Sequence, residues 1–390
     1  MIDFGHLAAG LDFSTLPQQF VNGVLLGAIY ALIALGYTMV YGVLRLINFA
    51  HGEVFMLGAY TALFTSWAFG YRGLGGPESS IWVLGAMLLA CMAACGAIGV
   101  LIERLAYRPM RNQPRISILI TAIGVSLLLQ YGGTLVLPNS PPPSISQKVI
   151  PSQFSGSTEI NLTAPDAKLA ASFKKLGAEY KTALSAYDEL RATVPVGAPE
   201  PPELKPLRDA RNTAEREMNT IQRELDNSAV RVRIPKGQLI MLGTTVVLMI
   251  LLTMLVMGTP AGRAMRAVSH DFDSASLMGI NVGRTITFTF LIGSMLAGAG
   301  AMMNATFIGT PLTSFYGFQP GVKAFVAAVL GGIGNIPGAV LGGLLMGVAE
   351  TFVVWLGFSS HRDAVAFVIL IVVLLFRPGG LLGSSKVEKV

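Results

Sequence analysis

Charged side chains are scarce outside one segment of this 390-residue chain. Only 13% of the residues are charged, against about a quarter in ordinary globular domains. Hydrophobic residues make up 52%, and the mean hydropathy is +0.60. Residues 138–236 contain 14 of the 28 basic and 12 of the 22 acidic side chains. This distribution excludes an ordinary soluble protein and predicts a membrane domain with one polar insertion.

Cysteine and histidine are also rare, and neither forms a pattern that carries chemistry. Cys91 and Cys95 lie four residues apart in one apolar run, which excludes a disulfide scaffold. The four histidines lack metal-ligand spacing, and the chain has no phosphate-binding P-loop or nucleophile motif. The net charge of +6 is spread over loops, unlike that of a nucleic-acid-binding face. We therefore expect no enzyme activity, no catalytic residue, no metal or other cofactor, and no nucleic acid partner.

Several apolar stretches are long enough to cross a bilayer, which takes about 20 mostly apolar residues. The predicted fold is an all-α polytopic membrane helix bundle of about nine spans, with an extracytoplasmic helical hairpin as its insertion. The membrane domain has two parts, residues 17–137 and 237–376, and one of its spans is short or re-entrant. The predicted helices cover residues 17–43, 51–70, 81–103, 116–137, 238–258, 285–304 and 337–357, with shorter ones at 320–334 and 362–376.

Basic residues in the short loops predict the orientation, because such loops are enriched in Lys and Arg on the cytoplasmic side. They are Arg45 after the first helix, four arginines within residues 104–115, three arginines within residues 263–284, and Arg377 with two lysines at the C-terminus. Placing all of them in the cytoplasm puts the C-terminus inside. The N-terminus and the 138–236 insertion then lie outside.

The insertion carries two helical patterns separated by a break. Apolar residues recur at spacings of four and three from Leu169 to Val194, and a second series runs from Leu207 to Leu225. The proline-rich stretch 195–206 cannot continue a helix. We predict an antiparallel hairpin with arms of about 25–30 residues. It is either a stalk or a docking arm for an extracytoplasmic partner.

Polar groups within the apolar stretches are costly there and so mark candidates for a translocation path or gate. For Asn48, His51 and Glu53, the alternative is a helix cap stabilised by the helix dipole. For Glu350, the alternative is pairing inside the bundle. Pairs of glycines four residues apart, such as Gly23/Gly27 and Gly343/Gly347, predict close helix packing. The polar candidates are Asn48, His51, Glu53 and Glu350. Gly332 and Gly334 are added because their glycine-rich stretch is expected to form a broken or re-entrant element.

The basic segment 259–285 is amphipathic and long for a connection. Ser269 or Asp271 is expected to cap a short helix, with an apolar face that includes Phe272, Ala275, Leu277 and Met278. We expect this helix to dock a cytoplasmic protein; the alternative is a helix lying on lipid. The candidate docking residues are Arg263, Arg266, Asp271, Asp273, Ala275 and Gly279.

Several motifs carry a family resemblance. Residues 273–279 (Asp-Ser-Ala-Ser-Leu-Met-Gly) resemble the Glu-Ala-Ala-x-x-x-Gly loop of bacterial ABC importer permeases, although Ser274 departs from it. Residues 22–42, 47–53, 103–109 and 323–339 resemble the permeases of high-affinity branched-chain amino acid importers of the LivH type. The resemblance runs in order through residues 20–137 and 238–390. The 150–235 hairpin exceeds what this family usually has in that loop.

The resemblance implies a multi-pass permease subunit of the bacterial inner membrane. It would pair with a second homologous permease and two ATP-binding subunits, which hydrolyse the ATP, and 259–285 would be the coupling loop. A periplasmic binding protein would deliver leucine, isoleucine or valine. The alternatives are a related permease for urea, amides or another amino acid; a self-sufficient channel or secondary transporter using Glu53, Glu350 and Lys323; and a membrane anchor for the hairpin.

Overall fold

The computed structural model describes residues 13–383 except 45–46, 73–76, 78, 112, 164–166, 193–200 and 229. Arg45 and the first half of the proline-rich stretch 195–206 therefore lie outside the described residues. The chain divides into two compact units. One contains residues 19–157 and 234–383, called the membrane unit below, and the other contains residues 13–18 and 158–233.

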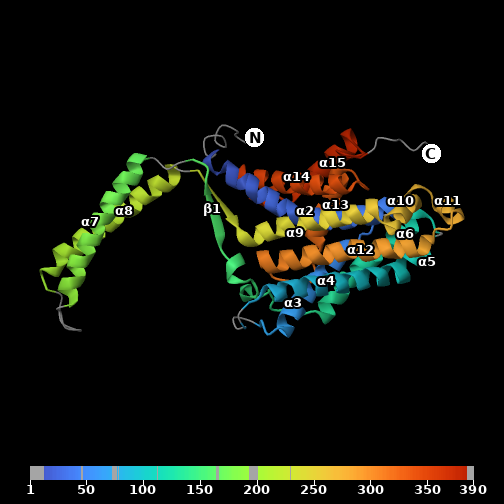
Figure 1. Cartoon of the computed structure of the whole chain (residues 1–390), viewed down its shortest axis with the longest axis horizontal. Helices are drawn as coiled ribbons and strands as arrows, with labels where there is room; N and C mark the ends of the chain where they lie inside the picture. The colour runs from blue at the N-terminus through green and yellow to red at the C-terminus, as the bar shows by residue number, and fades with distance from the viewer. Residues whose placement is uncertain are drawn as a thin grey trace. The chain divides into compact units, whose positions relative to one another are not determined.

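The membrane unit is a bundle of helices that lie side by side along one direction (Figure 1). This confirms the predicted all-α membrane bundle. Among the described residues, six helical stretches are long and apolar enough to cross a membrane: Phe13–Leu44, Ile81–Met110, Ile116–Val136, Lys236–Gly258, Val282–Ile308 and Ile336–Trp355. The helices are α2 (Leu16–Leu44), α3 (His51–Ala68), α4 (Ile81–Ile102), α5 (Arg108–Met110), α6 (Arg115–Val136), α9 (Lys236–Gly258), α10 (Pro260–His270), α11 (Phe272–Leu277), α12 (Val282–Met303), α13 (Phe318–Gly331), α14 (Ile336–Trp355) and α15 (Ala364–Phe376).

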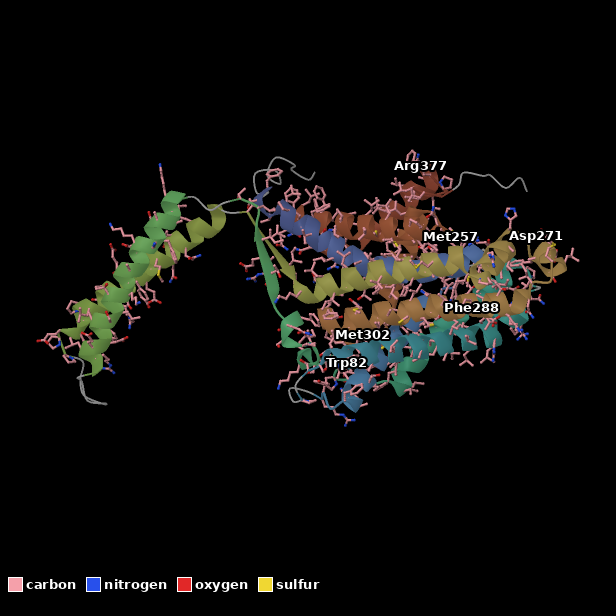
Figure 2. All side chains as sticks on the ribbon, in the orientation of Figure 1. Trp82, Met257, Asp271, Phe288, Met302 and Arg377 are labelled. Carbon is pink, nitrogen blue, oxygen red and sulfur yellow. The ribbon has the colours of Figure 1, made fainter. Side chains whose placement is uncertain are left out.

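Two helices form the centre of this bundle. The most apolar window of α2 is 89% buried and that of α12 is 72% buried, against 22% for α6 and for α9. A helix that is apolar on all sides is suited to such a buried position, and α2 shows no polar face. Exposed Trp82 at the start of α4 and Asp271 between α10 and α11 mark opposite ends of the membrane unit (Figure 2).

Glycines bring α2 and α14 into backbone contact. A Cβ atom on Gly27 would lie 2.6 Å from the Cα of Leu344, and one on Gly343 would lie 2.5 Å from the backbone nitrogen of Ala31. Gly23 and Gly347 meet the facing helix in the same way. Lipid tails are as apolar as helix surfaces, so membrane helices associate through this kind of close packing. The packing role predicted for these glycine pairs is confirmed.

α13 is a short helix that ends in an irregular turn. Its 14 residues correspond to about 21 Å, less than the roughly 30 Å of a hydrocarbon core. Gly332 and Gly334 follow with positive φ angles of 103° and 92°, a conformation that disfavours side chains. The N–H groups of Leu381 and Leu382 donate to the carbonyls of Leu330 and Gly331, so the C-terminal segment covers the turn.

The second unit contains two long helices. α7 (Ala167–Ala192) and α8 (Leu204–Ser228) pack against each other, and the Arg211 guanidinium lies 4.5 Å from the Tyr187 ring centroid. Strands β1 (Ser157–Asn161) and β2 (Arg231–Pro235) form a two-stranded sheet. The N–H of Leu162 donates to the Val230 carbonyl and that of Lys236 to the Gly156 carbonyl, which makes the sheet antiparallel.

Residues 138–157 belong to the membrane unit, although their polar composition assigned them to the insertion. Ile145 and Val149 are buried, and the N–H of Leu312 donates to the Pro143 carbonyl at 2.7 Å. Asn139 Oδ1 accepts a hydrogen bond from the hydroxyl of Tyr60 at 2.9 Å. This stretch, rich in serine and proline, forms only short 3₁₀ turns at Gln147–Val149 and Ser152–Phe154.

We predict that Gly27→Leu or Gly343→Leu will destabilise the chain. A side chain forced between the α2 and α14 backbones should cost about 1–3 kcal/mol or more of unfolding free energy. Gly124→Leu on α6 is the matched control, because nothing lies within 4 Å of its Cβ position. The measurement is the unfolding midpoint in detergent. A Gly27→Leu chain as stable as the control would contradict the packing.

Candidate functional site

The junction between α2 and α3 holds the first group of predicted pathway residues. The sequence predicts Asn48 as the cap of α3, whereas Ala50 occupies the N-cap position. Asn48 Oδ1 instead accepts hydrogen bonds from the Ala50 N–H at 3.1 Å and from the Tyr107 hydroxyl at 3.0 Å. Asn48 therefore shapes the turn that precedes α3 rather than capping the helix itself.

His51 is packed into the core beside α2. A Cβ atom on Gly36 would meet the imidazole, so the absence of a side chain there makes room for His51. The imidazole ring centroid lies 4.5 Å from that of Tyr37. His51 is completely buried and lines neither of the two cavities described below.

Glu53, two residues further along α3, lines a largely apolar cavity. Glu53 is 1% exposed, and its Oε1 accepts a hydrogen bond from Ser126 at 2.9 Å. Its Oε2 has no hydrogen-bond partner within the described part of the chain. The cavity volume of about 410 Å³ falls within the roughly 300–1,000 Å³ of small-molecule sites. The lining residues are Tyr37, Phe49, Gly52, Glu53, Ile123, Ser126, Leu127, Gln130, Gly317, Phe318, Gly321, Val322, Phe325, Val326, Phe367 and Leu370.

Close backbone contact forms one edge of this cavity. A Cβ atom on Gly52 would lie 2.8 Å from the Gly317 carbonyl oxygen, and one on Gly321 would lie 2.9 Å from the Gly52 Cα. The first turns of α3 and α13 therefore meet inside the bundle. Irregular backbone at this depth is tolerated only where protein or a cavity surrounds it.

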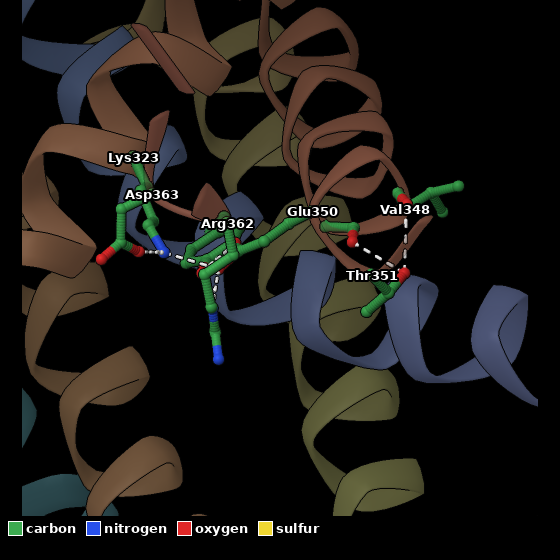
Figure 3. Close-up of polar contacts among 8 residues, drawn as sticks. Lys323, Val348, Glu350, Thr351, Arg362 and Asp363 are labelled. Carbon is green, nitrogen blue, oxygen red and sulfur yellow. Dashed lines mark hydrogen bonds and ion pairs between the residues drawn. The ribbon is translucent and has the colours of Figure 1, made fainter. Parts of the chain in front are cut away.

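Glu350 lies apart from that cavity, at the centre of a cluster of charges (Figure 3). Its Oε1 accepts from Lys323 Nζ and from Arg362 Nε, each at 2.6 Å, and its Oε2 accepts from the Tyr30 hydroxyl at 2.7 Å. Lys323 Nζ also lies 2.7 Å from Asp363 Oδ1. Glu350 is therefore paired inside the bundle, which is the alternative that the sequence left open.

The charges of this cluster support one another. The side chains of Glu350 and Lys323 are 1% and 6% exposed, and such buried charges require partners. Lys323 donates a hydrogen bond to Asp363 and so lowers the pKa of that carboxyl below its ordinary value. The cluster joins α13, α14 and the turn before α15 to Tyr30 of α2.

A second cavity, of about 440 Å³, lies beside the cluster. It combines apolar walls from α2 and from the π-helical turn Asn304–Ile308 after α12 with polar and charged walls. The lining residues are Leu26, Ile29, Tyr30, Asn304, Ile308, Thr310, Gln319, Pro320, Lys323, Arg362 and Asp363. The sequence did not single out Arg362 or Asp363, which lie at the start of the predicted helix 362–376.

The remaining pathway candidates, Gly332 and Gly334, lie in the turn between α13 and α14. A Cβ on Gly332 would overlap the backbone of Gly383, and one on Gly334 would lie 3.7 Å from the Gly42 Cα. Gly332 is buried, whereas Gly334 is exposed. These two glycines, the α3 start and Glu350 therefore occupy three separate places.

The segment between α9 and α12 forms two short capped helices. Thr259 Oγ1 accepts from the Gly262 N–H at 3.1 Å at the start of α10. Asp271 Oδ1 accepts from the Ser274 N–H at 2.7 Å at the start of α11, so Asp271 rather than Ser269 is the cap. This hydrogen bond lowers the pKa of the Asp271 carboxyl.

The predicted apolar face of α11 is wrong, because its members point in different directions. Ala275 is 4% exposed and packs inward, whereas Leu277 is 88% and Met278 84% exposed. The helix has only six residues, which is too short for one stripe to gather all four apolar side chains. Among the other docking candidates, Arg263, Arg266, Asp271, Asp273 and Gly279 are exposed.

Arg266 also anchors this segment. Its guanidinium donates a hydrogen bond to the carbonyl of Val256, near the end of α9. Gly279 follows α11 with a φ angle of 81° and nothing within 4 Å of its Cβ position. Within the described ranges, no group of three or more His, Cys, Asp or Glu side chains could hold a metal ion.

Comparison with known proteins gives a consistent result along the chain. Residues 19–374 match the family model for the permease component of branched-chain amino acid transport systems. No solved structure matches the chain.

Three relatives are permease proteins of high-affinity branched-chain amino acid transport systems. They are LivH of Salmonella typhimurium (35% identical), BraD of Pseudomonas aeruginosa (36%) and LivH of Escherichia coli (34%). Each match spans 96% of this chain and 97% of the relative. The chain therefore belongs to the family of branched-chain amino acid transport permeases.

Proposed function

We propose that the chain is the membrane-spanning permease subunit of an ATP-driven importer of branched-chain amino acids in a bacterial inner membrane. The observation that carries this proposal is the apolar 410 Å³ cavity with Glu53 in its wall, in a chain whose full-length relatives are such permeases. The cavity would accept the solute during its passage. ATP hydrolysis would take place on separate subunits.

The composition of the cavity favours an aliphatic solute over urea or an amide. Its walls are mainly Ile, Leu, Val and Phe side chains, with few polar groups such as Ser126 and Gln130. Urea is polar on every edge and would leave hydrogen bonds unmade against these walls. A leucine, isoleucine or valine side chain buries apolar surface there instead, at about 25 cal/mol per Å².

A self-sufficient channel or secondary transporter fits the charges less well. In that reading Glu53, Glu350 and Lys323 form a charged path across the membrane. Lys323 and Glu350 instead pair directly at 2.6 Å, and Glu53 lines a different cavity. Uptake driven by an ion gradient through this chain alone would favour that reading.

The α10–α11 segment would couple the permease to an ATP-binding subunit. Leu277 and Met278 present exposed apolar surface, and the caps at Thr259 and Asp271 hold both helices in shape. Arg266 ties α10 to the end of α9. Movement of the ATP-binding subunit would therefore pass to α9 and α12 as a rigid-body shift.

The proposed assembly contains further subunits and has one orientation in the membrane. A second homologous permease would complete the path, two ATP-binding subunits would contact the α10–α11 segments, and a periplasmic binding protein would deliver the amino acid. The C-terminus and α10–α11 would be cytoplasmic. The N-terminus and the α7–α8 insertion would be periplasmic, as the basic loops predict.

Filling the cavity tests the proposed path. We expect Ile123→Trp, which places an indole in the cavity wall, to lower ATP-driven leucine uptake at least tenfold in vesicles that contain the complete transporter. Ile120→Trp is the matched control, because Ile120 lies one turn away on α6, is 65% exposed and does not line the cavity. Equal uptake by the two variants would exclude this cavity as the path.

Charging the exposed end of α11 tests the coupling role. We expect Leu277→Asp with Met278→Asp to reduce copurification of ATP-binding subunits and to lower ATP-driven uptake at least tenfold. Both side chains are exposed, so the chain itself should fold normally. Leu162→Asp, at a 55% exposed position in the other unit, is the control. Unchanged uptake by the double variant would refute the coupling assignment.

Deleting the insertion distinguishes the permease hypothesis from the alternative, a membrane anchor that assembles other proteins. Replacing residues 163–229 by a short Gly-Ser linker keeps the strands that flank them. If the insertion is a stalk, uptake should fall by no more than about twofold while the complex still forms. Loss of uptake, together with silent charge changes in α11, would favour the anchor.

A further inference from the structure

The second cavity carries two half-exposed charges of opposite sign in consecutive residues. The side chain of Arg362 is 47% exposed and that of Asp363 is 49% exposed, although both belong to the buried Glu350 cluster. Both line the 440 Å³ cavity. Buried ion pairs that serve stability alone do not need to present two charged groups to an open cavity.

Arg362 presents a half-exposed guanidinium to this cavity. Its Nε donates to Glu350, which fixes the guanidinium at its inner edge, and Tyr30 lies within hydrogen-bonding reach of it. The guanidinium points away from the Lys323–Asp363 pair (Figure 3). Two parallel N–H donors match the two oxygens of a carboxylate.

Asp363 supplies the opposite charge. Lys323 Nζ lies 2.7 Å from its Oδ1, and because the carboxylate is half-exposed it can accept further hydrogen bonds from the cavity side. The spacing of four residues puts Gln319 and Lys323 on one face of α13, so both reach this cavity. The cavity therefore offers one group that can bind a carboxylate and, close to it, one group that can bind an ammonium.

The charge balance selects the kind of ligand. The cluster contains the cations Lys323 and Arg362 and the anions Glu350 and Asp363, so its formal charge is zero. Lys323, Arg362 and Asp363 line the cavity, so a simple anion would meet the Asp363 carboxylate and a simple cation would meet two basic groups. A zwitterion can pair with the basic groups and with the carboxylate at the same time. Selection of this kind works largely by rejecting ligands that carry a charge of only one sign.

The remaining walls accept an aliphatic group. Leu26 and Ile29 of α2 and Ile308 in the π-helical turn after α12 form the apolar side of the cavity. Leu26 lies 11 residues before Tyr37, which lines the first cavity, and this separation corresponds to about 16 Å along α2. In the proposed orientation, a solute coming from outside meets the charged cavity first.

We propose that this cavity is an outer binding site for a zwitterionic α-amino acid. Arg362 holds the α-carboxylate, Asp363 receives the α-ammonium, and Leu26, Ile29 and Ile308 contact the aliphatic side chain. Naming a branched-chain side chain rests on the proposed function. The requirement for a zwitterion rests on the charges of the cavity alone.

Equilibrium binding of radiolabelled L-leucine to the detergent-solubilised complex, without the periplasmic binding protein, tests the proposal. The competitors are 3-methylbutylamine, which lacks the carboxylate, and 4-methylpentanoate, which lacks the ammonium. Each should compete at least about tenfold more weakly than unlabelled leucine, because a hydrogen bond to a charged group contributes about 1.5–3 kcal/mol. Equal competition by either analogue, or no saturable leucine binding at millimolar concentrations, would overturn the zwitterion site.

Variants identify the residue. Arg362→Gln should weaken leucine binding at least tenfold and abolish the preference for leucine over 3-methylbutylamine. Arg362→Lys keeps the charge but loses the forked pair of N–H donors. Its affinity for leucine should therefore lie between that of Arg362→Gln and that of the unchanged protein. Arg377→Gln, at an exposed position that lines neither cavity, is the matched control and should leave this binding unchanged. An Arg362→Gln protein that still binds leucine and prefers it over the amine as the unchanged protein does would refute the assignment.

Two further readouts separate the possible failures. If Arg362→Gln lowers the unfolding midpoint as much as Glu350→Gln does and the preference among ligands is unchanged, Arg362 serves the ion-pair network only. If the complete transporter takes up no branched-chain amino acid while zwitterion-selective binding persists, the proposed function is wrong and the site stands. Uptake that proceeds without any leucine binding sensitive to Arg362 would refute the site and leave the function intact.

Discussion

The backbone contact between α2 and α14 is the constraint on which the rest of the membrane unit depends. Four glycines let the two helices touch, and this brings the Tyr30 hydroxyl within 2.7 Å of Glu350. Glu350 in turn holds Lys323 of α13 and Arg362 before α15. A larger side chain at the contact would separate the helices, and buried charges that lose their partners are strongly destabilising. Close packing and charge pairing are therefore parts of the same arrangement.

α13 connects the two cavities. Its residues Val322 and Val326 line the apolar cavity, while Gln319 and Lys323 line the charged one. The helix is too short to cross a bilayer alone, and its ends meet glycine-rich backbone at Gly52 and at Gly332. Because α13 contributes walls to both cavities, a displacement of this helix would alter the two cavities together.

The helices and their approximate ends were predictable because bilayer thickness imposes a length and an apolar composition on each span. α2, α4, α6 and α9 begin and end within two residues of their predicted limits. Glu53 and Glu350 were also identifiable, because acidic residues in apolar stretches are unusual. Their partners were not identifiable. Ser126 lies 73 residues from Glu53, and Tyr30 lies 320 residues from Glu350.

The sequence by itself determined that this is an all-helical membrane protein of a known permease family, because hydropathy and family motifs are local properties of the chain. Only the tertiary structure decided which polar groups are paired and which face a cavity. Arg362 and Asp363 only begin a predicted helix in the sequence, yet they line a cavity beside a buried ion cluster. Ala275 belongs to an apparent apolar stripe, yet it points inward while Leu277 points outward. Burial and pairing depend on contacts between distant segments, which no local pattern specifies.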